Sequence, residues 1–182
     1  LNYQGKAAGM FSKARFFRNR PDLRWGYPVH EQLMINSGHR RATFTGLMID
    51  HMPEKIPAAS SARNLQILEH EMETGADNLW LQFCYTRELW GRGITEGDRA
   101  TANKAIQIMQ ELIDGQQLEA GNLAGLCNRV AMYYFYHCPR NETALKLAET
   151  YSRLSISFST NFSEPYAILG EIYFERNDPK RA

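Results

Sequence analysis

The spacing of apolar residues changes once along the chain, at about residue 58. Before this point, short aromatic runs such as Phe16-Phe17, flanked by Arg15 and Arg18, are separated by glycine and proline, which indicates loops and short strands. From Ala58 onward proline is rare and apolar residues recur at intervals of three and four, the spacing of amphipathic helices. The sequence therefore predicts a mainly helical fold preceded by an irregular segment over residues 1–57.

Capping residues and helix breakers divide the second region into six expected helices. They begin at Ser60 or Ser61, at Asp77 or Asn78, at about Glu96, near Leu123, after Asn141 and after Ser163. The first four end at Gly75, at Gly91-Arg92-Gly93, at Gly115 and at Pro139, because glycine and proline interrupt helices. A seventh helix is expected to begin at Asp178-Pro179. The second and third helices, and the fourth and fifth, should form antiparallel pairs.

Three of the expected helices repeat one pattern with an offset of 43 residues. Four positions of the pattern are equivalent in the three helices. They are occupied by Trp80, Leu123 and Tyr166, by Phe83, Leu126 and Leu169, by Cys84, Cys127 and Gly170, and by Arg87, Val130 and Tyr173. In the partner helices, Ala105 coincides with Ala148. A small residue between large ones lets the paired helix approach closely, while the large side chains fill the groove between adjacent pairs. We therefore expect stacked helix pairs.

The last of these helices, Tyr166-Ala-Ile-Leu169-Gly170-Glu-Ile-Tyr173 with Ala182 after it, resembles the tetratricopeptide repeat (TPR). The resemblance implies an α-solenoid of TPR-like antiparallel helix pairs over 77–119, 120–162 and a truncated 163–182. The first two units have a period of 43 residues instead of about 34, so their helices or turns must be longer. Any antiparallel helical array needs a comparable pattern of large and small residues.

A second resemblance begins near the start of the chain. The stretches Lys13-Ala-Arg15-Phe-Phe-Arg18-Asn19, Trp25-Gly26 and Val29-His30-Glu31 are followed by Ile49-Asp-His51 and by Arg63-Asn64 with Glu69 and Glu71. This series is similar to the end of the catalytic domain in family 2 glycosyltransferases of the GT-A type that carry a TPR tail. The resemblance implies that residues 1–57 are the last loops and strands of that α/β domain and that 58–76 is a bridging helix.

This resemblance implies a nucleotide-sugar-dependent, inverting transferase assisted by Mn²⁺ or Mg²⁺. In the family, the nucleotide-binding strands and the metal-binding Asp-x-Asp precede the segment that is similar here, and no Asp-x-Asp occurs in these residues. Without a cation held by carboxylates, the leaving diphosphate would not be neutralised. We therefore expect the chain alone to be inactive, and a nucleotide sugar to bind only together with the missing nucleotide-binding half.

His30 and Glu31 are the leading candidates for chemistry. An imidazole can ligate the metal of a GT-A site, and the Glu31 carboxylate can orient an acceptor hydroxyl or act as a base. Pro28 disfavours a regular central strand here, and adjacent residues on a strand would point to opposite faces. His51 is a weaker candidate for metal ligation. A structural role at a domain edge, in capping, packing or hydrogen bonding, is the alternative for each of them.

Two further sets of residues are candidates for binding. Arg15, Arg18 and Trp25 could clamp a phosphate or stack a base, or they could be solvated edge residues. In the helices, Tyr133, Tyr136 and Tyr166 are predicted to line a groove between repeats that binds a protein or peptide. Glu69, Glu71 and Glu73 alternate along one helix, where a solvated face is favoured over a catalytic carboxylate pair.

Composition excludes several classes of protein. With 21 Lys and Arg against 20 Asp and Glu, no global field favours nucleic acid. No stretch approaches the roughly 18 apolar residues of a membrane span, and we expect a cytoplasmic protein. The three cysteines match neither a disulfide framework nor a CxxC metal site, so reduced thiols are expected. The P-loop, the dinucleotide fingerprint, Gly-x-Ser-x-Gly and zinc-ligand spacing are absent.

Three functions remain open from the sequence. The leading prediction is the C-terminal portion of a glycosyltransferase, which binds the acceptor or a partner. The alternative is a TPR-type interaction scaffold without chemistry or cofactor, in which residues 1–57 cap the superhelix. The third is a structural subunit that forms homo-oligomers through exposed helical faces.

Overall fold

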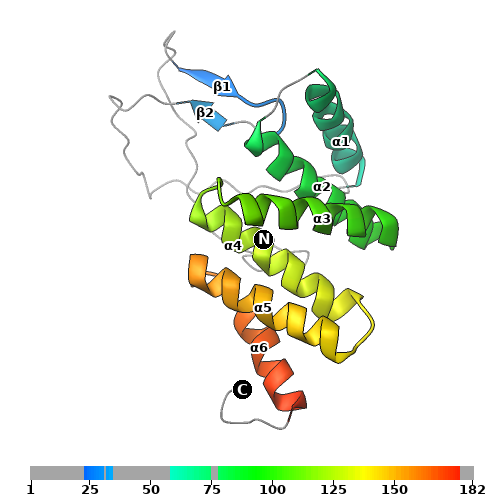
Figure 1. Cartoon of the computed structure of the whole chain (residues 1–182). Coiled ribbons are helices and arrows are strands. Elements are labelled where there is room, and N and C mark those ends of the chain that lie inside the picture. The colour runs from blue at the N-terminus through cyan, green and yellow to red at the C-terminus, as the bar shows by residue number, and fades with distance from the viewer. Residues whose placement is uncertain (1–22, 31, 35–57, 75–77, 177–182) are drawn as a thin grey trace, which may run out of the picture. The chain divides into compact units, whose positions relative to one another are not determined.

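A computed structural model of the chain describes residues 23–30, 32–34, 58–74 and 78–176. These residues form a short β-hairpin, six α-helices and one π-helical turn (Figure 1), so the prediction of a mainly helical fold is confirmed. The chain divides into two compact units, residues 1–68 and 69–182. None of the helices in the described ranges is long and apolar enough to cross a membrane.

In the first unit, strands β1, Arg24–Gly26, and β2, Gln32–Met34, form an antiparallel hairpin. Tyr27 and His30, which lie between them, have φ angles of 68° and 53°, left-handed conformations that non-glycine residues rarely adopt. Pro28 lacks the N–H that a strand would donate to its neighbour. His30 therefore lies in the turn and not on a strand, and the argument from alternating strand faces does not apply to it.

Helix α1, Ala58–Glu73, contains the boundary between the two units. It starts before the predicted caps Ser60 and Ser61, because the two alanines that precede them are strong helix formers. Leu65 and Leu68, which lie three residues apart on one side of this helix, are buried.

Helix α2, Leu79–Glu96, continues through Gly91 and Gly93, where we had predicted its end. Packing explains the error. A Cβ atom on Gly93 would lie 2.6 Å from the backbone nitrogen of Ala102 in the next helix, so glycine at this position permits two helices to cross closely. The helix ends instead at Gly97, whose φ of 69° is readily adopted by glycine.

Helix α3, Arg99–Gly115, begins later than the predicted Glu96 because Asp98 caps it. The Asp98 carboxylate accepts hydrogen bonds from the backbone N–H groups of Ala100, at 3.0 Å, and Thr101, at 3.2 Å. Six apolar residues that recur at intervals of three and four along α3 are all buried: Ala102, Ala105, Ile106, Met109, Leu112 and Ile113. The helical period of the sequence therefore gave the packing face of α3 correctly.

Helix α4, Ala120–Met132, is the most enclosed helix of the second unit, with buried residues along most of its length. The prediction that it runs as a regular helix to Pro139 is wrong. A π-helical turn, η1, occupies Tyr133–His137. A π-helical turn closes its hydrogen bonds over five residues and so changes the direction in which the aromatic side chains point.

Helices α5, Glu142–Phe158, and α6, Glu164–Glu175, complete the described part of the chain. The Asn141 side chain caps α5, as predicted, by accepting a hydrogen bond of 2.9 Å from the backbone of Ala144. Ser163 stands at the predicted start of α6 but makes no capping hydrogen bond with its side chain. The seventh helix expected at Asp178-Pro179 lies outside the described residues.

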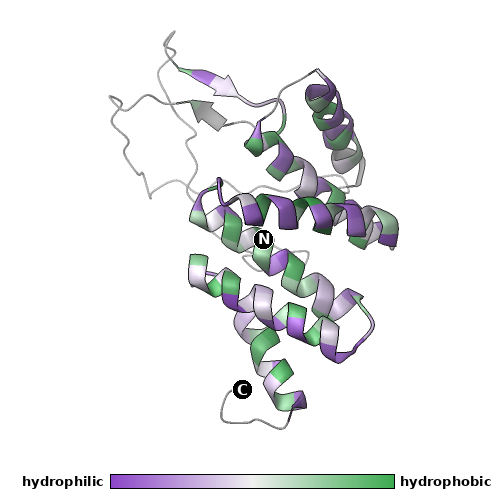
Figure 2. Cartoon of the chain, in the orientation of Figure 1, coloured by the Kyte–Doolittle hydropathy of each residue, from purple (hydrophilic) through white to green (hydrophobic). Residues whose placement is uncertain are grey.

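The helices of the second unit pack as pairs, α2 with α3 and α4 with α5, and α6 packs on α4 and α5 (Figure 1). The 43-residue offset is visible in their burial, because Cys84 and Cys127 are both fully buried, as are Ala105 and Ala148. Figure 2 shows hydrophobic and hydrophilic residues alternating along these helices, as expected for helices with one buried face.

Helix α6 departs from this pattern. Its buried contacts come from Ile168, Ile172 and Tyr173, which join the core cluster that α4, η1 and α5 form. Tyr166, at the position equivalent to Leu123, is 47% exposed, and Leu169 is half-buried. The stripe that α4 buries in full, which consists of Leu123, Leu126, Cys127 and Val130, is therefore only partly covered on α6.

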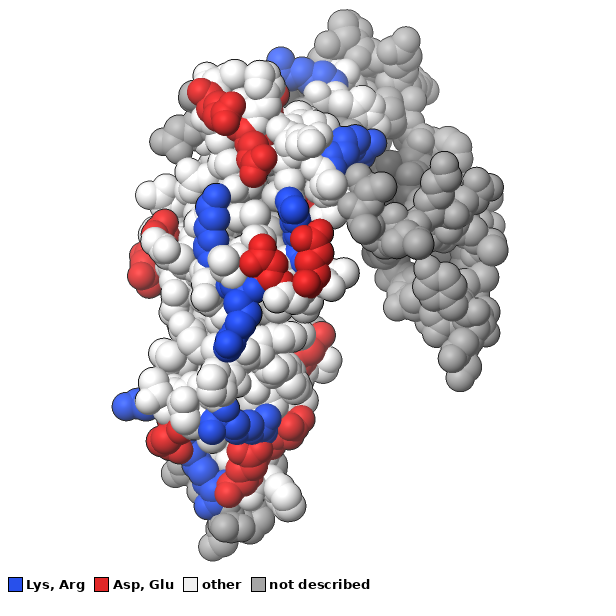
Figure 3. All heavy atoms as spheres, turned by 90° about the vertical axis from the view of Figure 1, so that its right-hand side faces the viewer, with Lys and Arg blue, Asp and Glu red and all other residues white. Residues whose placement is uncertain are grey.

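A network of ion pairs holds α6 to α5. The Glu149 carboxylate accepts hydrogen bonds from Arg176, at 2.6 Å, and from Arg153 and Tyr173, both at 3.1 Å. Arg176 also donates to Glu142 at 2.6 Å. Figure 3 shows acidic and basic side chains adjoining one another on the face that it presents, without one large region of a single sign. The ion pairs of Arg176 with Glu142 and Glu149 thus add to the packing of α6 on α5.

Partial burial raises the pKa of Glu149, but the hydrogen bonds from Arg176, Arg153 and Tyr173 outweigh burial and hold it below its ordinary value of 4.5. A carboxyl group with a lowered pKa in the folded state stabilises the fold above that ordinary value. This stabilisation is lost as the pH falls through the folded-state pKa.

We predict opposite effects for alanine at two glycines of α2. In Gly93→Ala, the new methyl group meets the Ala102 backbone, and we expect a loss of about 1–3 kcal/mol in the free energy of unfolding. In the matched control Gly91→Ala, no atom lies within 4 Å, and alanine should add about 0.5–1 kcal/mol. Thermal denaturation followed by circular dichroism measures both. Equal effects would contradict the proposed close crossing.

We further predict that Glu149→Gln makes the free energy of unfolding of the second unit depend less on pH in the acid range. Above pH 5 the variant should be less stable than the wild type, and the difference should shrink as the pH falls, because the wild-type carboxylate becomes protonated. Urea denaturation between pH 3 and pH 7 measures this. Asp114→Asn is the control, since no hydrogen bond or ion pair of the Asp114 side chain is found in the described residues; the same pH dependence in both variants would refute the assignment.

Candidate functional site

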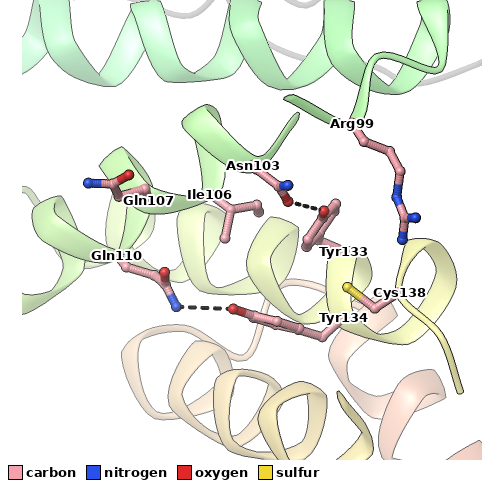
Figure 4. Close-up of a pocket in the computed structure, with 8 residues that line it drawn as sticks. All are labelled: Arg99, Asn103, Ile106, Gln107, Gln110, Tyr133, Tyr134 and Cys138. Carbon is pink, nitrogen blue, oxygen red and sulfur yellow. Dashed lines mark hydrogen bonds between the residues drawn. The ribbon is translucent and has the colours of Figure 1, made fainter. Parts of the chain in front are cut away.

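A groove of about 430 Å³ lies between α3 and the segment that follows α4 (Figure 4). From α3 it is lined by Arg99, Asn103, Ile106, Gln107 and Gln110, and from the facing segment by Tyr133, Tyr134 and Cys138. The α3 residues recur at helical spacing on one face, and the packing of α4 on α3 brings the second group opposite them. The lining consists mainly of carboxamides and phenols and contains one cation and no carboxylate.

Asn103 is oriented by a phenol. The hydroxyl group of Tyr133 donates a hydrogen bond to Oδ1 of Asn103, and Figure 4 shows the two side chains pointing toward each other. Tyr133 itself is buried, with 5% of its surface exposed. Burial is the main cause of the raised pKa of Tyr133, so its hydroxyl group stays protonated and acts as a donor.

Gln110 is held by two phenols from different elements. Its Nε2 donates a hydrogen bond of 2.9 Å to the hydroxyl oxygen of Tyr151 on α5 and a longer one of 3.5 Å to Tyr134. The rings of Tyr134 and Tyr151 stack, with 6.3 Å between their centroids and 14° between their planes. Gln107 donates to Glu111 at 3.1 Å. Internal hydrogen bonds therefore restrain all three carboxamides of the groove.

Aromatic contacts of the π-helical turn hold Tyr133 of the groove lining in place. Tyr133 and His137 stack with their ring centroids 6.3 Å apart, and Trp90 of α2 lies edge-on to both rings at 5.9 Å. Such aromatic contacts each contribute about 0.5–1.5 kcal/mol beyond the area they bury. They compensate for the less regular backbone of η1 and fix the position of Tyr133.

The cysteines are not activated. Burial is the main cause of the raised pKa of Cys138, although its contact with Tyr133 and the charge of Arg99 act in the opposite direction. Burial raises the pKa of Cys84 to about 11 and that of Cys127 to about 12. A thiolate is the nucleophile in cysteine chemistry, so none of the three is suited to catalysis at neutral pH.

The structure places the three tyrosines predicted for a partner groove at different sites. Tyr133 lines the groove, mainly through its hydroxyl end. Tyr136 is 51% exposed and Tyr166 is 47% exposed, and neither belongs to the groove lining. Sequence reasoning missed Asn103 and Gln110, although their spacing on one face of α3 was available as a signal.

Of the residues predicted for chemistry and substrate binding, the structure describes two. Trp25 lies on β1 opposite Leu33, and 57% of its surface is exposed. His30 is exposed in the hairpin turn. The other predicted residues, Arg15, Arg18, Glu31 and His51, lie outside the described residues. Within the described ranges, no group of three or more His, Cys, Asp or Glu side chains is placed to hold a metal ion.

Comparison with known proteins gives no assignment. No family model matches the chain, and no curated protein or solved structure matches it significantly. The resemblances to glycosyltransferases and to TPR proteins therefore depend on the sequence motifs.

We predict that the three thiols differ in their accessibility to reagents from solvent, although none of them has a lowered pKa. With Ellman's reagent at pH 8, Cys138 should react slowly in the native protein because it is half-buried with a raised pKa. Cys84 and Cys127 should react only after unfolding in urea, since both are fully buried. Cys138→Ser should abolish the native phase. Rapid reaction of more than one thiol in the folded protein would contradict the packing described here.

Proposed function

We propose that this chain is the acceptor- or partner-binding portion of a nucleotide-sugar-dependent glycosyltransferase, with a TPR-like helical unit. Support for the transferase class comes from the series of motifs that includes Arg15-Phe-Phe-Arg18-Asn19, Val29-His30-Glu31 and Ile49-Asp-His51. In the family that these motifs resemble, they occur in this order before a helical tail.

The observation that carries the binding role is the hydrogen-bonding groove between α3 and η1. Its carboxamides are held in place by phenols, and its lining is polar without being strongly charged. Preorganised polar groups lower the cost of ordering on binding. Such a surface is suited to a ligand rich in hydrogen-bonding groups.

The TPR-like character of the helical unit is also part of the proposal. Its support is the repeated burial of equivalent residues, Cys84 with Cys127 and Ala105 with Ala148, at an offset of 43 residues. Units that share this packing form a surface that continues from one pair to the next. In this proposal, that continuity places the groove at the junction of the first and second pairs.

A divalent cation is implied by the transferase family, but the described residues do not provide a site for one. His30 is the one candidate ligand among them, and no cluster of three ligands occurs in the described ranges. The proposal therefore assigns the cation to the nucleotide-binding half of such an enzyme and derives no step through it here. Glu31 is proposed to orient the acceptor hydroxyl or to remove its proton.

The alternative is a TPR-type scaffold without chemistry, and one observation favours it. The groove belongs wholly to the unit of residues 69–182, whereas every candidate for chemistry or substrate binding belongs to residues 1–68. Binding in the groove would therefore be possible without any transferase activity. Measurement of sugar transfer separates the two functions.

We predict that the natural protein containing this segment consumes a nucleotide sugar in the presence of Mn²⁺, and that Glu31→Gln lowers the rate by roughly 10²–10⁴-fold, as for loss of a general base. Release of labelled sugar from UDP-, GDP- and dTDP-sugars measures this. Glu73→Gln is the control, because Glu73 is an exposed residue at the end of α1. Failure to consume any donor would favour the scaffold, whereas full activity in Glu31→Gln would refute the role proposed for Glu31 and leave the transferase class standing.

A further inference from the structure

The groove presents a donor and an acceptor at fixed positions. Oδ1 of Asn103 accepts from Tyr133, so the two N–H groups on its Nδ2 are left for a ligand. Nε2 of Gln110 donates to Tyr151, so its Oε1 is left as an acceptor. Neither Nδ2 of Asn103 nor Oε1 of Gln110 has a hydrogen-bond partner among the described residues.

The rise along α3 between these two residues matches an extended polypeptide. Seven residues separate Asn103 from Gln110 on α3, which corresponds to about 10.5 Å along a helix that rises about 1.5 Å per residue. An extended chain advances about 3.3 Å per residue, so about three residues span the same distance. Asn103 would then donate to a backbone carbonyl group, and Gln110 would accept from a backbone N–H group of the same segment.

Arg99 adds a preference for negative charge. It lies one helical turn before Asn103, is exposed, and is the single cation of the groove lining, which contains no carboxylate. No ion pair of Arg99 occurs among the described residues. A guanidinium group binds a carboxylate through two parallel hydrogen bonds, so an acidic side chain fits this end of the groove.

The aromatic residues argue against a saccharide in the same groove. A sugar ring bound by stacking needs an open aromatic face. Tyr133 is 5% exposed, and one face of Tyr134 is covered by Tyr151. The phenols of the groove thus serve mainly as hydrogen-bonding supports for Asn103 and Gln110.

We propose that the groove between α3 and η1 binds an extended polypeptide segment that carries a carboxylate at the Arg99 end. This inference rests on the binding role proposed above and identifies the ligand as a protein partner. Backbone hydrogen bonds to Asn103 and Gln110 hold the segment, and Arg99 selects its acidic residue. The wider transferase assignment is not needed for this binding.

The test is selection of phage-displayed random dodecapeptides on the whole 182-residue chain, followed by fluorescence anisotropy with synthetic copies of the selected peptides. We expect peptides with Asp or Glu at one fixed position. Arg99→Gln should weaken their binding about tenfold or more, because the charge-assisted hydrogen bonds to the carboxylate are lost. Arg99→Glu should transfer the preference to peptides with Lys or Arg at that position.

Asn103→Ala and Gln110→Ala should each weaken binding whatever the charge of the peptide, because they remove contacts to the peptide backbone. Gln117→Ala, an exposed amide outside the groove lining, is the matched control and should bind as the wild type does. Circular dichroism checks that each variant is folded, and the exposed Arg99 variants remain informative if an amide variant unfolds.

Three results would overturn the inference. The first is that the selected peptides share no fixed acidic position, and the second is that the Arg99 variants bind the peptides as the wild type does. The third is that the protein binds to a glycan array and that Asn103→Ala abolishes this binding. The measurement of donor consumption is independent of all three. A protein that consumes nucleotide sugars but selects no peptide refutes the peptide site alone, whereas one that selects peptides but consumes no donor refutes the transferase alone.

Discussion

Close approach between helices at small residues is the constraint on which the second unit depends. Gly93 of α2 leaves no room for a side chain against Ala102 of α3, and Ala105 and Ala148 are fully buried at equivalent positions of the two pairs. Because the backbones lie close together, the larger apolar residues beside them fill the remaining space at interior density. The groove is a consequence of this packing, since it forms where α3 and the end of α4 are held side by side.

The sequence determined which faces of these helices are buried much better than where the helices end. Its period gave all six inward residues of α3, and the cap at Asn141 was identified correctly. The prediction for Gly91 and Gly93 was wrong because the sequence alone does not distinguish a glycine that ends a helix from one that lets a neighbouring helix pack closely. The π-helical turn was missed for a related reason, since its aromatic contacts involve Trp90, more than forty residues earlier in the chain.

The groove was only partly predictable. The aromatic run was singled out in the sequence, and one of its members, Tyr133, lines the groove. Asn103 and Gln110 look like ordinary surface amides, and their significance comes from the phenols of Tyr133 and Tyr151, which lie 30 and 41 residues away. In the first unit, the predictions for Glu31, His51 and the residues before β1 stay predictions, because they depend on motifs and not on described geometry.

The π-helical turn has a consequence for how this surface can change during evolution. An extra residue in a regular helix rotates everything after it by about 100°, which would move the buried face of the following segment into solvent. A π-helical turn absorbs such a residue within Tyr133–His137, and Asn141 then starts α5 with a cap of its own. The aromatic wall of the groove can therefore acquire or lose a residue by insertion or deletion while α4 before it and α5 after it keep their register.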